Sequence, residues 1–400
     1  MSRDELRDVL HVSLIAGHLL LESGANIARV EEAMHTLGTG LGADWMEVYV
    51  TPSGIIATAV SHGETRTRIQ RVVHSGVQLS KVVAVTNTVK AAANGQLKRC
   101  ETEAALNKLN QLPRCYSPWL TAIAVGLACS AFLVLFGGSL TEAAVVLATA
   151  TLAQFLRHFL LKARLGRYLC TTVVAAFATY LALLCSARWG LSQLTVAGSL
   201  LLLVPGVPLI SGTADLFRGD TLAGMARATS AFLTLIAGVI GVWAVILVSG
   251  QMVELKVSSL QHPGLTLLMG MLSAIGFAVL FDVPPRYLLG AGAVGAVATG
   301  TRWWALHLGI PAVAAAFLAG LALGAVANGL AYWRQAPSSL FTIPGYIPLV
   351  PGAVALNSIL HLVKENYSAG VSDLIKASLI LMAVAIGQGI VKALAQSNRW

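Results

Sequence analysis

The stretch VPGVPLISGTADLFRGDTLAGMAR, residues 204–227, decides what kind of fold this chain has. It follows an apolar run long enough for a membrane helix, yet it contains two prolines, four glycines, two aspartates and two arginines. Proline removes a backbone donor and breaks the hydrogen-bond ladder of a helix. The freed backbone groups cannot face lipid, so they must be buried in protein or line a wet cavity. The stretch therefore predicts a site inside a membrane protein.

The composition of the whole chain also indicates a membrane protein. Mean hydropathy is +0.74, and charged residues make up 11% of the 400, whereas soluble domains contain about a quarter. Residues 1–118 contain 12 Lys/Arg and 11 Asp/Glu, and residues 119–400 contain 15 and 7, so the net charge of +9 lies almost entirely in the second part. Its basic residues lie in short loops between apolar runs, which favours a lipid bilayer as partner and not nucleic acid.

About twenty apolar residues cross the hydrocarbon core, and the chain after Trp119 contains ten such candidates. They lie near residues 119–136, 140–160, 168–187, 191–210, 229–249, 264–281, 286–301, 308–333, 340–363 and 371–393. The opening MSRDELRDVLHVSL has acids where a cleavable leader needs an apolar core, so we expect the N-terminal domain to stay in the cytoplasm. Ten Lys/Arg then lie in inner connections and four in outer ones. This predicts an inner-membrane protein with both termini cytoplasmic.

The membrane half contains an internal repeat. VPGVPLISG (204–212) recurs as IPGYIPLVPG (343–352) with one residue inserted, and each copy is followed by a small AG pair and one more long span. Five spans are an odd number, so the second copy enters the membrane upside down. We therefore predict an α-helical polytopic protein of two inverted five-helix repeats, residues 119–255 and 264–400, behind a cytosolic α+β domain over residues 1–118. Interrupted helices at matching positions are typical of secondary transporters; a kinked helix with an ordinary loop is the alternative.

The two interruptions supply the first candidate binding residues. Their prolines, including Pro208 and Pro348, break the ladder, and their glycines permit the turns that follow. Helix ends made in this way direct partial charges at bound ions. The candidates are Pro205, Gly206, Gly212, Pro344, Gly345, Pro351 and Gly352.

Four charged residues follow the first interruption. An ionisable group at membrane depth is costly unless paired or hydrated, so Asp215 indicates a proton or substrate path. Its carboxylate could bind a substrate ammonium or accept the coupling proton, and Arg218 could pair with it or hold a substrate carboxylate. Asp220 and Arg227 complete the group. A solvated cytoplasmic loop is the alternative.

The second copy offers weaker candidates. In the register above, Ala355 stands opposite Asp215, Asn357 is polar but neutral, and Asp373 is the comparable acid, which a helix-start position would also explain. Asn328 ends a stripe of small residues that favours close helix packing, with contact to a cavity as the alternative. Asp282, before VPPR, is expected to cap or anchor a boundary.

The first 118 residues predict a small α+β domain. Helical periodicity covers residues 4–22, 27–41, 77–94 and 101–110, and residues 45–73 predict three strands with SHGE as a hairpin turn. His11, His18 and Glu22 share a helical face, but unlinked polar residues explain this equally, and we expect no metal and no cofactor. His62 and His74 lack a recognisable nucleophile, so assembly or gating is the preferred role and a membrane enzyme the alternative.

With these residues the chain resembles the threonine/serine exporter family. The similarity lies in the PG…DLxxGDxxxGxxR pattern of residues 205–227, in GFAVLFDVPPR (276–286) with IPGYIPLVPG, and in LLESGANIARVEEAM (20–34) with VTPSGI (50–55). The resemblance implies export of threonine and serine driven by the proton-motive force. Two-subunit relatives are linked to succinate export, so a dicarboxylate exporter is the second hypothesis. Oligomeric state stays open.

Overall fold

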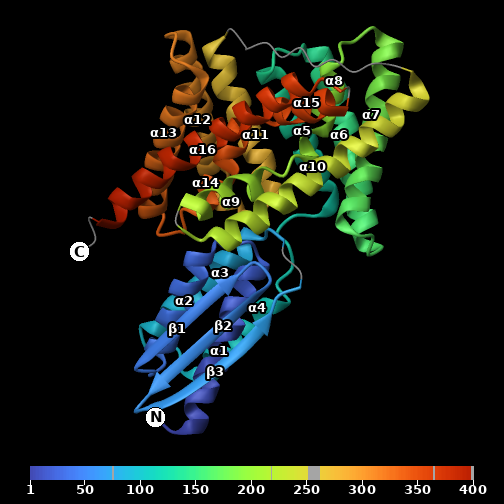
Figure 1. Ribbon diagram of the computed structural model, residues 1–400. Helices are drawn as coiled ribbons and strands as arrows, with labels where there is room; N and C mark the ends of the chain where they lie inside the picture. The colour runs from blue at the N-terminus through green and yellow to red at the C-terminus, as the bar shows by residue number, and fades with distance from the viewer. Residues whose placement is uncertain (74–75, 218, 251–261, 364, 398–400) are drawn as a thin grey trace. The chain divides into compact units, whose positions relative to one another are not determined.

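The computed structural model describes residues 1–73, 76–217, 219–250, 262–363 and 365–397 (Figure 1). The chain forms two compact units. Unit 1 contains residues Met1–Cys115 together with two short segments, Asp220–Ala226 and Phe281–Pro284. Unit 2 contains Tyr116–Gly219, Arg227–Leu280 and Pro285–Trp400. Two residues that the sequence singled out, His74 and Arg218, lie outside the described residues.

Unit 1 confirms the predicted helices and strands of the first domain. Its antiparallel sheet has the order β1-β2-β3, and the predicted SHGE turn joins β2 to β3 with positive φ at His62 and Gly63, as a tight hairpin turn requires. The elements are α1 Arg3–Glu22, α2 Ile27–Gly40, β1 Trp45–Thr51, β2 Gly54–Ser61, β3 Glu64–Arg71, α3 Leu79–Ala93 and α4 Arg99–Asn110.

Helix α1 is the centre of unit 1, because it contacts the other three helices and two strands. Its leucines Leu6, Leu10 and Leu20 are fully buried, and β2 turns Ile55 inward on alternating positions. The chain forms a helix here because Ser2 and Glu5 form a capping box in front of the apolar periodicity. The leucine-bearing face of α1 therefore forms part of the core of unit 1.

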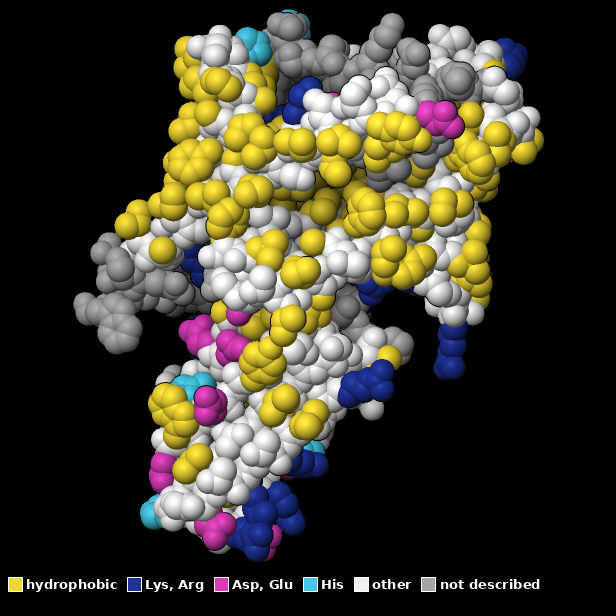
Figure 2. Space-filling model, viewed as in Figure 1, with side chains coloured by type: hydrophobic (Ala, Val, Ile, Leu, Met, Phe, Trp, Pro, Cys, Tyr) yellow, Lys and Arg dark blue, Asp and Glu magenta, His cyan; other side chains and the backbone are white. Residues whose placement is uncertain are grey.

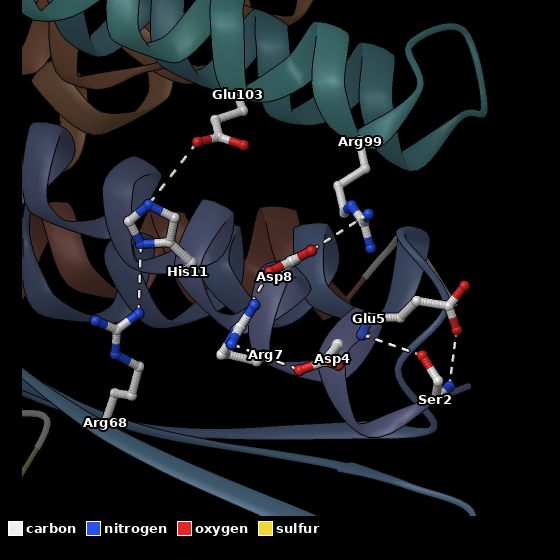
Figure 3. Close-up of polar contacts among 9 residues, drawn as sticks. All are labelled: Ser2, Asp4, Glu5, Arg7, Asp8, His11, Arg68, Arg99 and Glu103. Carbon is white, nitrogen blue, oxygen red and sulfur yellow. Dashed lines mark hydrogen bonds and ion pairs between the residues drawn. The ribbon is translucent and has the colours of Figure 1, made fainter.

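Polar contacts join the outer face of α1 to its neighbours (Figure 3). Asp8 lies 3.3 Å from Arg99 of α4, and His11 lies 3.8 Å from Glu103 of α4 and 3.5 Å from Arg68 of β3. Most of these side chains are substantially exposed, so the contacts orient the elements more than they stabilise them.

The regular elements of unit 2 are all helices over its described residues, and many hydrophobic side chains lie on the face of unit 2 that Figure 2 shows. Helices with so many outward-facing apolar residues require lipid around them. The helices are α5 Pro118–Leu135, α6 Leu140–Lys162, α7 Arg167–Trp189, α8 Leu194–Leu200, η1 Leu201–Leu203, α9 Gly206–Phe217, α10 Thr221–Ser249, α11 Pro263–Leu280, η2 Pro285–Tyr287, α12 Leu288–His307, α13 Ala312–Trp333, α14 Ser339–Tyr346, η3 Ile347–Leu349, α15 Gly352–Val363 and α16 Tyr367–Ser397. Helix α10 begins in the unit 1 segment.

Seven of the described helices are long and apolar enough to cross a membrane, or eight spans if a bent pair counts as one. The seven are α5, α6, α7, α10, α11, α13 and α16. The bent pair joins residues 194–203 to α9 at an angle of 60°. The chain is therefore a multi-pass membrane protein, and two of the ten predicted spans, those at α12 and at α14–α15, do not meet the same length and hydropathy test.

The same order of elements occurs twice in unit 2. The starts of η1, α9 and α10 at residues 201, 206 and 221 and of η3, α15 and α16 at residues 347, 352 and 367 differ by a constant 146 residues. This pairs LVPG at 203–206 with LVPG at 349–352, so the register expected from the sequence, which paired Gly212 with Gly352, is wrong. The residue opposite Asp215 is thus His361 and not Ala355.

The breaks themselves are short extended links. Val204 and Val350 have φ, ψ of −65°, 121° and −63°, 125°, and each is followed by a proline directly before the first residue of the next helix, Gly206 or Gly352. Pro344 instead lies inside α14, and Gly212 lies inside α9. The expected glycine turns are also wrong, because none of Gly206, Gly212, Gly345 and Gly352 has positive φ. Gly206, Gly345 and Gly352 allow close packing instead, and Gly345 does so against Val294.

Glycines let the long helices approach at equivalent places in the two copies. A Cβ on Gly241 of α10 would lie 2.2 Å from the carbonyl oxygen of Thr172 in α7, and one on Gly387 of α16 would lie 2.5 Å from that of Phe317 in α13. A Cβ on Gly320 in α13 would likewise lie 2.5 Å from the carbonyl oxygen of Val384 in α16. The packing role predicted for the stripe is confirmed for this residue.

We expect Gly387→Ala to destabilise the protein and Gly389→Ala to leave it unchanged or slightly more stable. A methyl group at Gly387 meets backbone, which cannot move aside cheaply and costs about 1–3 kcal/mol, whereas Gly389 on the same helix has nothing within 4 Å. Thermal unfolding of purified protein in detergent measures the difference. Equal melting temperatures for the two variants would contradict this packing.

Candidate functional site

The two interruptions pack against each other reciprocally. A Cβ on Gly206 would lie 3.0 Å from Ile347 Cδ1 and 3.2 Å from Val350 Cγ2. A Cβ on Gly352 would lie 3.1 Å from Leu201 Cδ2 and 3.3 Å from Val204 Cγ2. Each glycine therefore makes room for the aliphatic residues that precede the other break, and the contact is related by the same 146-residue shift.

The space between the interruptions is small and apolar in this conformation. A cavity of about 20 Å³ is lined by Leu201, Val204 and Gly352, among others, which is room for about one water molecule. A larger hollow of about 430 Å³ lies on α11–α13 beside Trp304 and Leu318, and its walls are also apolar. Neither cavity has a charged residue in its lining.

Among the described residues of unit 2, the shortest ion-pair distance joins α9 to α10. Arg227 Nη1 lies 2.8 Å from Asp215 Oδ2, and the side chains of these residues are 17% and 2% exposed. Helix α9 ends two residues after Asp215, and α10 begins at Thr221, so the tight connection brings Arg227 back beside the carboxylate. Opposite charges at this distance compensate each other inside an apolar unit, where either charge alone would be costly. The structure thus brings together two of the four charged residues that the sequence grouped.

Arg227 also lies close enough to Tyr346 to act electrostatically on its hydroxyl group. Tyr346 is 3% exposed and ends α14, directly before the second interruption. Tyr346 is not among the residues predicted from the sequence, because a tyrosine at the end of an apolar run has no charge to mark it. The ion pair of the first copy therefore neighbours the broken helix of the second.

Asp220 does not join Asp215 and Arg227. It directly precedes α10 and begins the segment Asp220–Ala226, which belongs to unit 1. Its charge acts on Glu31 of α2. Burial is the main cause that raises the pKa of the Glu31 carboxyl above its usual value, and the charge of Asp220 adds to it, while a hydrogen bond from the Val50 N–H opposes both. Of the four expected charges, Asp215 and Arg227 are paired, Asp220 belongs to unit 1, and Arg218 lies outside the described residues.

The remaining candidates are spread over the second copy. Asn328 is half-buried on α13, and Asn357 is half-buried on α15. Asp373 lies on α16 with Lys376 and His361 at 3.8 and 3.9 Å. The helix-start interpretation of Asp373 is wrong, because α16 begins at Tyr367, more than one turn earlier.

Asp282 anchors the α11–α12 connection within unit 1, as the sequence indicated. Its carboxylate accepts hydrogen bonds from the Ser80 hydroxyl and, at 2.7 Å, from the Cys115 N–H. The N–H groups of Leu79 and Ser80 donate to the carbonyls of Phe281 and Asp282, both at 2.9 Å. Asp282 has φ of 58°, a conformation that aspartate tolerates better than most residues.

The histidines of α1 face different partners. His18 pairs with Glu22 at 4.0 Å, whereas His11 faces Glu103 and Arg68 (Figure 3). Over the described residues, no three His, Cys, Asp or Glu side chains are grouped so that they could hold a metal ion.

Comparison with known proteins gives the family. The threonine/serine exporter model ThrE matches residues 11–249, more than half of the chain, and a second model, "Threonine/Serine exporter, ThrE", matches residues 266–394. The chain belongs to the threonine/serine exporter family. The sequence-based resemblance is thereby confirmed over both copies of the repeat. No solved structure matches.

Individual relatives carry two different names. Proteins of Klebsiella aerogenes and Escherichia coli named "Probable succinate transporter subunit YjjP" are each 31% identical over 60% of this chain and 93% and 95% of their own length. A Mycobacterium tuberculosis protein named "Probable threonine/serine exporter" is 25% identical over 96% of this chain and 75% of its own length. Transport is common to these names, and the transported molecule differs.

We expect Arg227→Ala to destabilise the protein more than the double variant Asp215→Ala/Arg227→Ala does. Removing the guanidinium alone leaves a buried carboxylate without its ion-pair partner, at a cost of about 3–5 kcal/mol. Thermal unfolding in detergent measures both variants. Lys376→Ala is the control, because that lysine is 65% exposed and its pair contributes little. Additive losses in the double variant would contradict a stabilising Asp215–Arg227 pair.

Proposed function

We propose that this protein is a secondary exporter that moves threonine or serine out of the cytoplasm at the expense of the proton-motive force. The buried Asp215–Arg227 pair behind the first interruption is the observation that supports it, together with membership of the threonine/serine exporter family. The protein acts as a transporter and not as an enzyme, as the names of its relatives suggest.

The charges of this pair match those of a free amino acid. A zwitterion carries one ammonium and one carboxylate, so it can exchange partners with the pair: its ammonium meets Asp215 and its carboxylate meets Arg227. Every buried charge then stays paired during binding, which avoids the large cost of an isolated charge in an apolar interior. The hydroxyl group shared by threonine and serine needs one further polar partner, and Tyr346 is the nearest phenol to Arg227 that the described contacts provide.

In this proposal the two copies are inverted repeats of five passes each, residues 119–255 and 264–400, behind the cytosolic domain of residues 1–118. The passes of the second copy include α12 and the α14–α15 pair, since these stand where α6 and the α8–α9 pair stand in the first. The excess of Lys/Arg in the inner connections favours the inner membrane with both termini cytoplasmic.

Transport then proceeds by alternating access around the interruptions. The aliphatic contact between Gly206 and Val350, and its counterpart between Gly352 and Val204, closes the path in the present conformation. A space of about 20 Å³ cannot hold threonine, so the two breaks must separate when cargo enters. Broken helices allow this because their link already lacks helical hydrogen bonds.

Unit 1 is the proposed gating element. It includes Asp220–Ala226, the first residues of α10, and Arg227 follows directly in the chain. A movement of unit 1 would therefore pull on the helix that carries the guanidinium of the ion pair.

We expect Asp215→Asn to reduce efflux of threonine from cells loaded with a threonine dipeptide. Losing one charge-assisted contact costs about 1.5–3 kcal/mol, or roughly 10- to 100-fold in rate. Arg227→Lys keeps the charge but loses the planar fork and should give a smaller loss. Asp44→Asn in unit 1 is the matched control and a strain without the protein gives the background. Wild-type efflux from Asp215→Asn would refute the role of this carboxylate.

A dicarboxylate exporter is the second candidate, and one observation favours it beyond the names of the relatives. The Nε atom of Arg302 in α12 is buried, and among the described residues it has no hydrogen-bond partner. An N–H donor of this kind, on a charged side chain, suits a carboxylate that the Asp215–Arg227 pair cannot balance.

If the cargo is succinate, Arg302→Gln should lower succinate efflux at least several-fold and leave threonine efflux unchanged. The lost guanidinium would leave one cargo carboxylate without a counter-charge. Efflux of both compounds is measured from the same cells, with the exposed Arg188→Gln as control. Threonine efflux without succinate efflux in the wild type would exclude this candidate.

A further inference from the structure

The second copy contains an ion pair of its own. His361 near the end of α15 and Asp373 on α16 lie with Nε2 and Oδ2 3.9 Å apart, and their side chains are 38% and 23% exposed. Asp373 was predicted from the sequence and His361 was not, because the wrong register placed Ala355 opposite Asp215. The 146-residue shift between the helices places His361 at that position.

This pair stands where Asp215 and Arg227 stand in the first copy. Residues 215 and 361 differ by 146, as do residues 227 and 373, and this is the same shift that relates the helices. Each copy thus joins the short helix after its break to the following long helix by one acid and one base. The order is reversed: the acid lies on the short helix in the first copy and on the long helix in the second.

The two bases differ in how they respond to pH. Arginine keeps its charge at every physiological pH, so the base of the first copy does not change its charge. Histidine is the side chain that ordinarily gains or loses its charge between about pH 5 and 8. The attraction between His361 and Asp373 therefore exists only while the imidazole holds a proton.

The contact that this pair spans is tight. The hydroxyl of Ser358, which is fully buried on α15, donates to the carbonyl of Gly370 on α16 at 2.7 Å. A Cβ on Gly370 would lie 2.7 Å from Leu362. Separation of α15 from α16 would expose Ser358, which makes this residue a reporter of the contact.

Among the described residues, few other charges lie on the helices that pack around the pair. On α16 the charged residues besides Asp373 are Lys376 and Lys392, and Lys376 lies 3.8 Å from Asp373. Helix α15 has no charged residue besides His361 within its bounds, and α13, which packs on α16, has none. Glu365 and Tyr367 lie in and after the α15–α16 connection, and Asp215 is the acid of α9, which also contacts α16.

We propose that His361 and Asp373 form a proton-binding latch: a proton on His361 holds α15 against α16, and its loss releases α15. The inference deepens the proposed function and rests on it, since it assigns the coupling proton to the second copy and leaves the Asp215–Arg227 pair for the cargo. The latch and the transport it serves can be tested separately.

The latch is tested by thiol labelling. Ser358→Cys is introduced into a full-length protein whose five native cysteines are replaced by alanine, and the rate of labelling by N-ethylmaleimide is measured in membranes at pH 6 and pH 8. The rate with His361 is divided by the rate with His361→Gln at each pH, which cancels the pH dependence of the thiol itself. We expect this ratio of labelling rates to be one third or less at pH 6 and close to one at pH 8.

Two further variants make the labelling result specific. Asp373→Asn should behave as His361→Gln does, and it replaces that variant if His361→Gln fails to fold. His307→Gln on α12 is the matched control, and it should give the wild-type rate at both pH values. A ratio that does not change between pH 6 and pH 8 would overturn the latch.

Transport is measured on the same proteins as exchange of radiolabelled threonine in proteoliposomes with equal pH on both sides, so that no proton gradient drives it. The latch predicts that exchange by the wild type changes with pH and that His361→Gln removes most of this change. Threonine exchange with a flat labelling ratio refutes the latch and keeps the proposed function. A labelling ratio that responds to pH without exchange of threonine refutes the threonine assignment and keeps the latch.

Discussion

The membrane unit depends on the mutual contact of its two breaks. Neither extended Val–Pro link can be exposed to lipid, because each leaves backbone groups without helical partners. Each is instead covered by the aliphatic residues that precede the other, and this is possible only because Gly206 and Gly352 have no side chain at the point of approach. The two copies must therefore fold together: one copy alone would leave its own break uncovered.

The sequence predicted well those features that follow from local pattern. The three strands and four helices of unit 1 and most membrane helices were found from periodicity, capping residues and hydropathy, which act over a few neighbouring residues. The repeat was found too, but in the wrong register, because IPG at 343–345 and VPG at 350–352 are both plausible partners of VPG at 204–206. Only the packed structure shows that Pro344 fits inside α14 while Pro351 follows the break.

The residues of the candidate site were predicted only where local sequence pattern marks them. Asp215 was identified because an acid beside an apolar run is conspicuous, and Arg227 because it lies close in sequence. Which of the neighbouring charges pairs with Asp215 depends on how α9 and α10 turn back on each other, and this divides Asp220 from Arg227. Tyr346 belongs to a contact between distant segments, for which a single sequence carries no signal, and His361 was missed because the wrong register placed Ala355 opposite Asp215.

The main-chain bonds at Asp282 have a consequence for how unit 1 is completed. Leu79 and Ser80 bind the backbone of Phe281 and Asp282, and these partners lie on opposite sides of the connection between α10 and α11. Backbone groups do not depend on side-chain identity, so substitutions at positions 79, 80, 281 and 282 can leave these main-chain bonds in place. The bonds tie a segment that follows α11 to the start of α3, so unit 1 is completed only by residues that lie about 200 positions later in the chain.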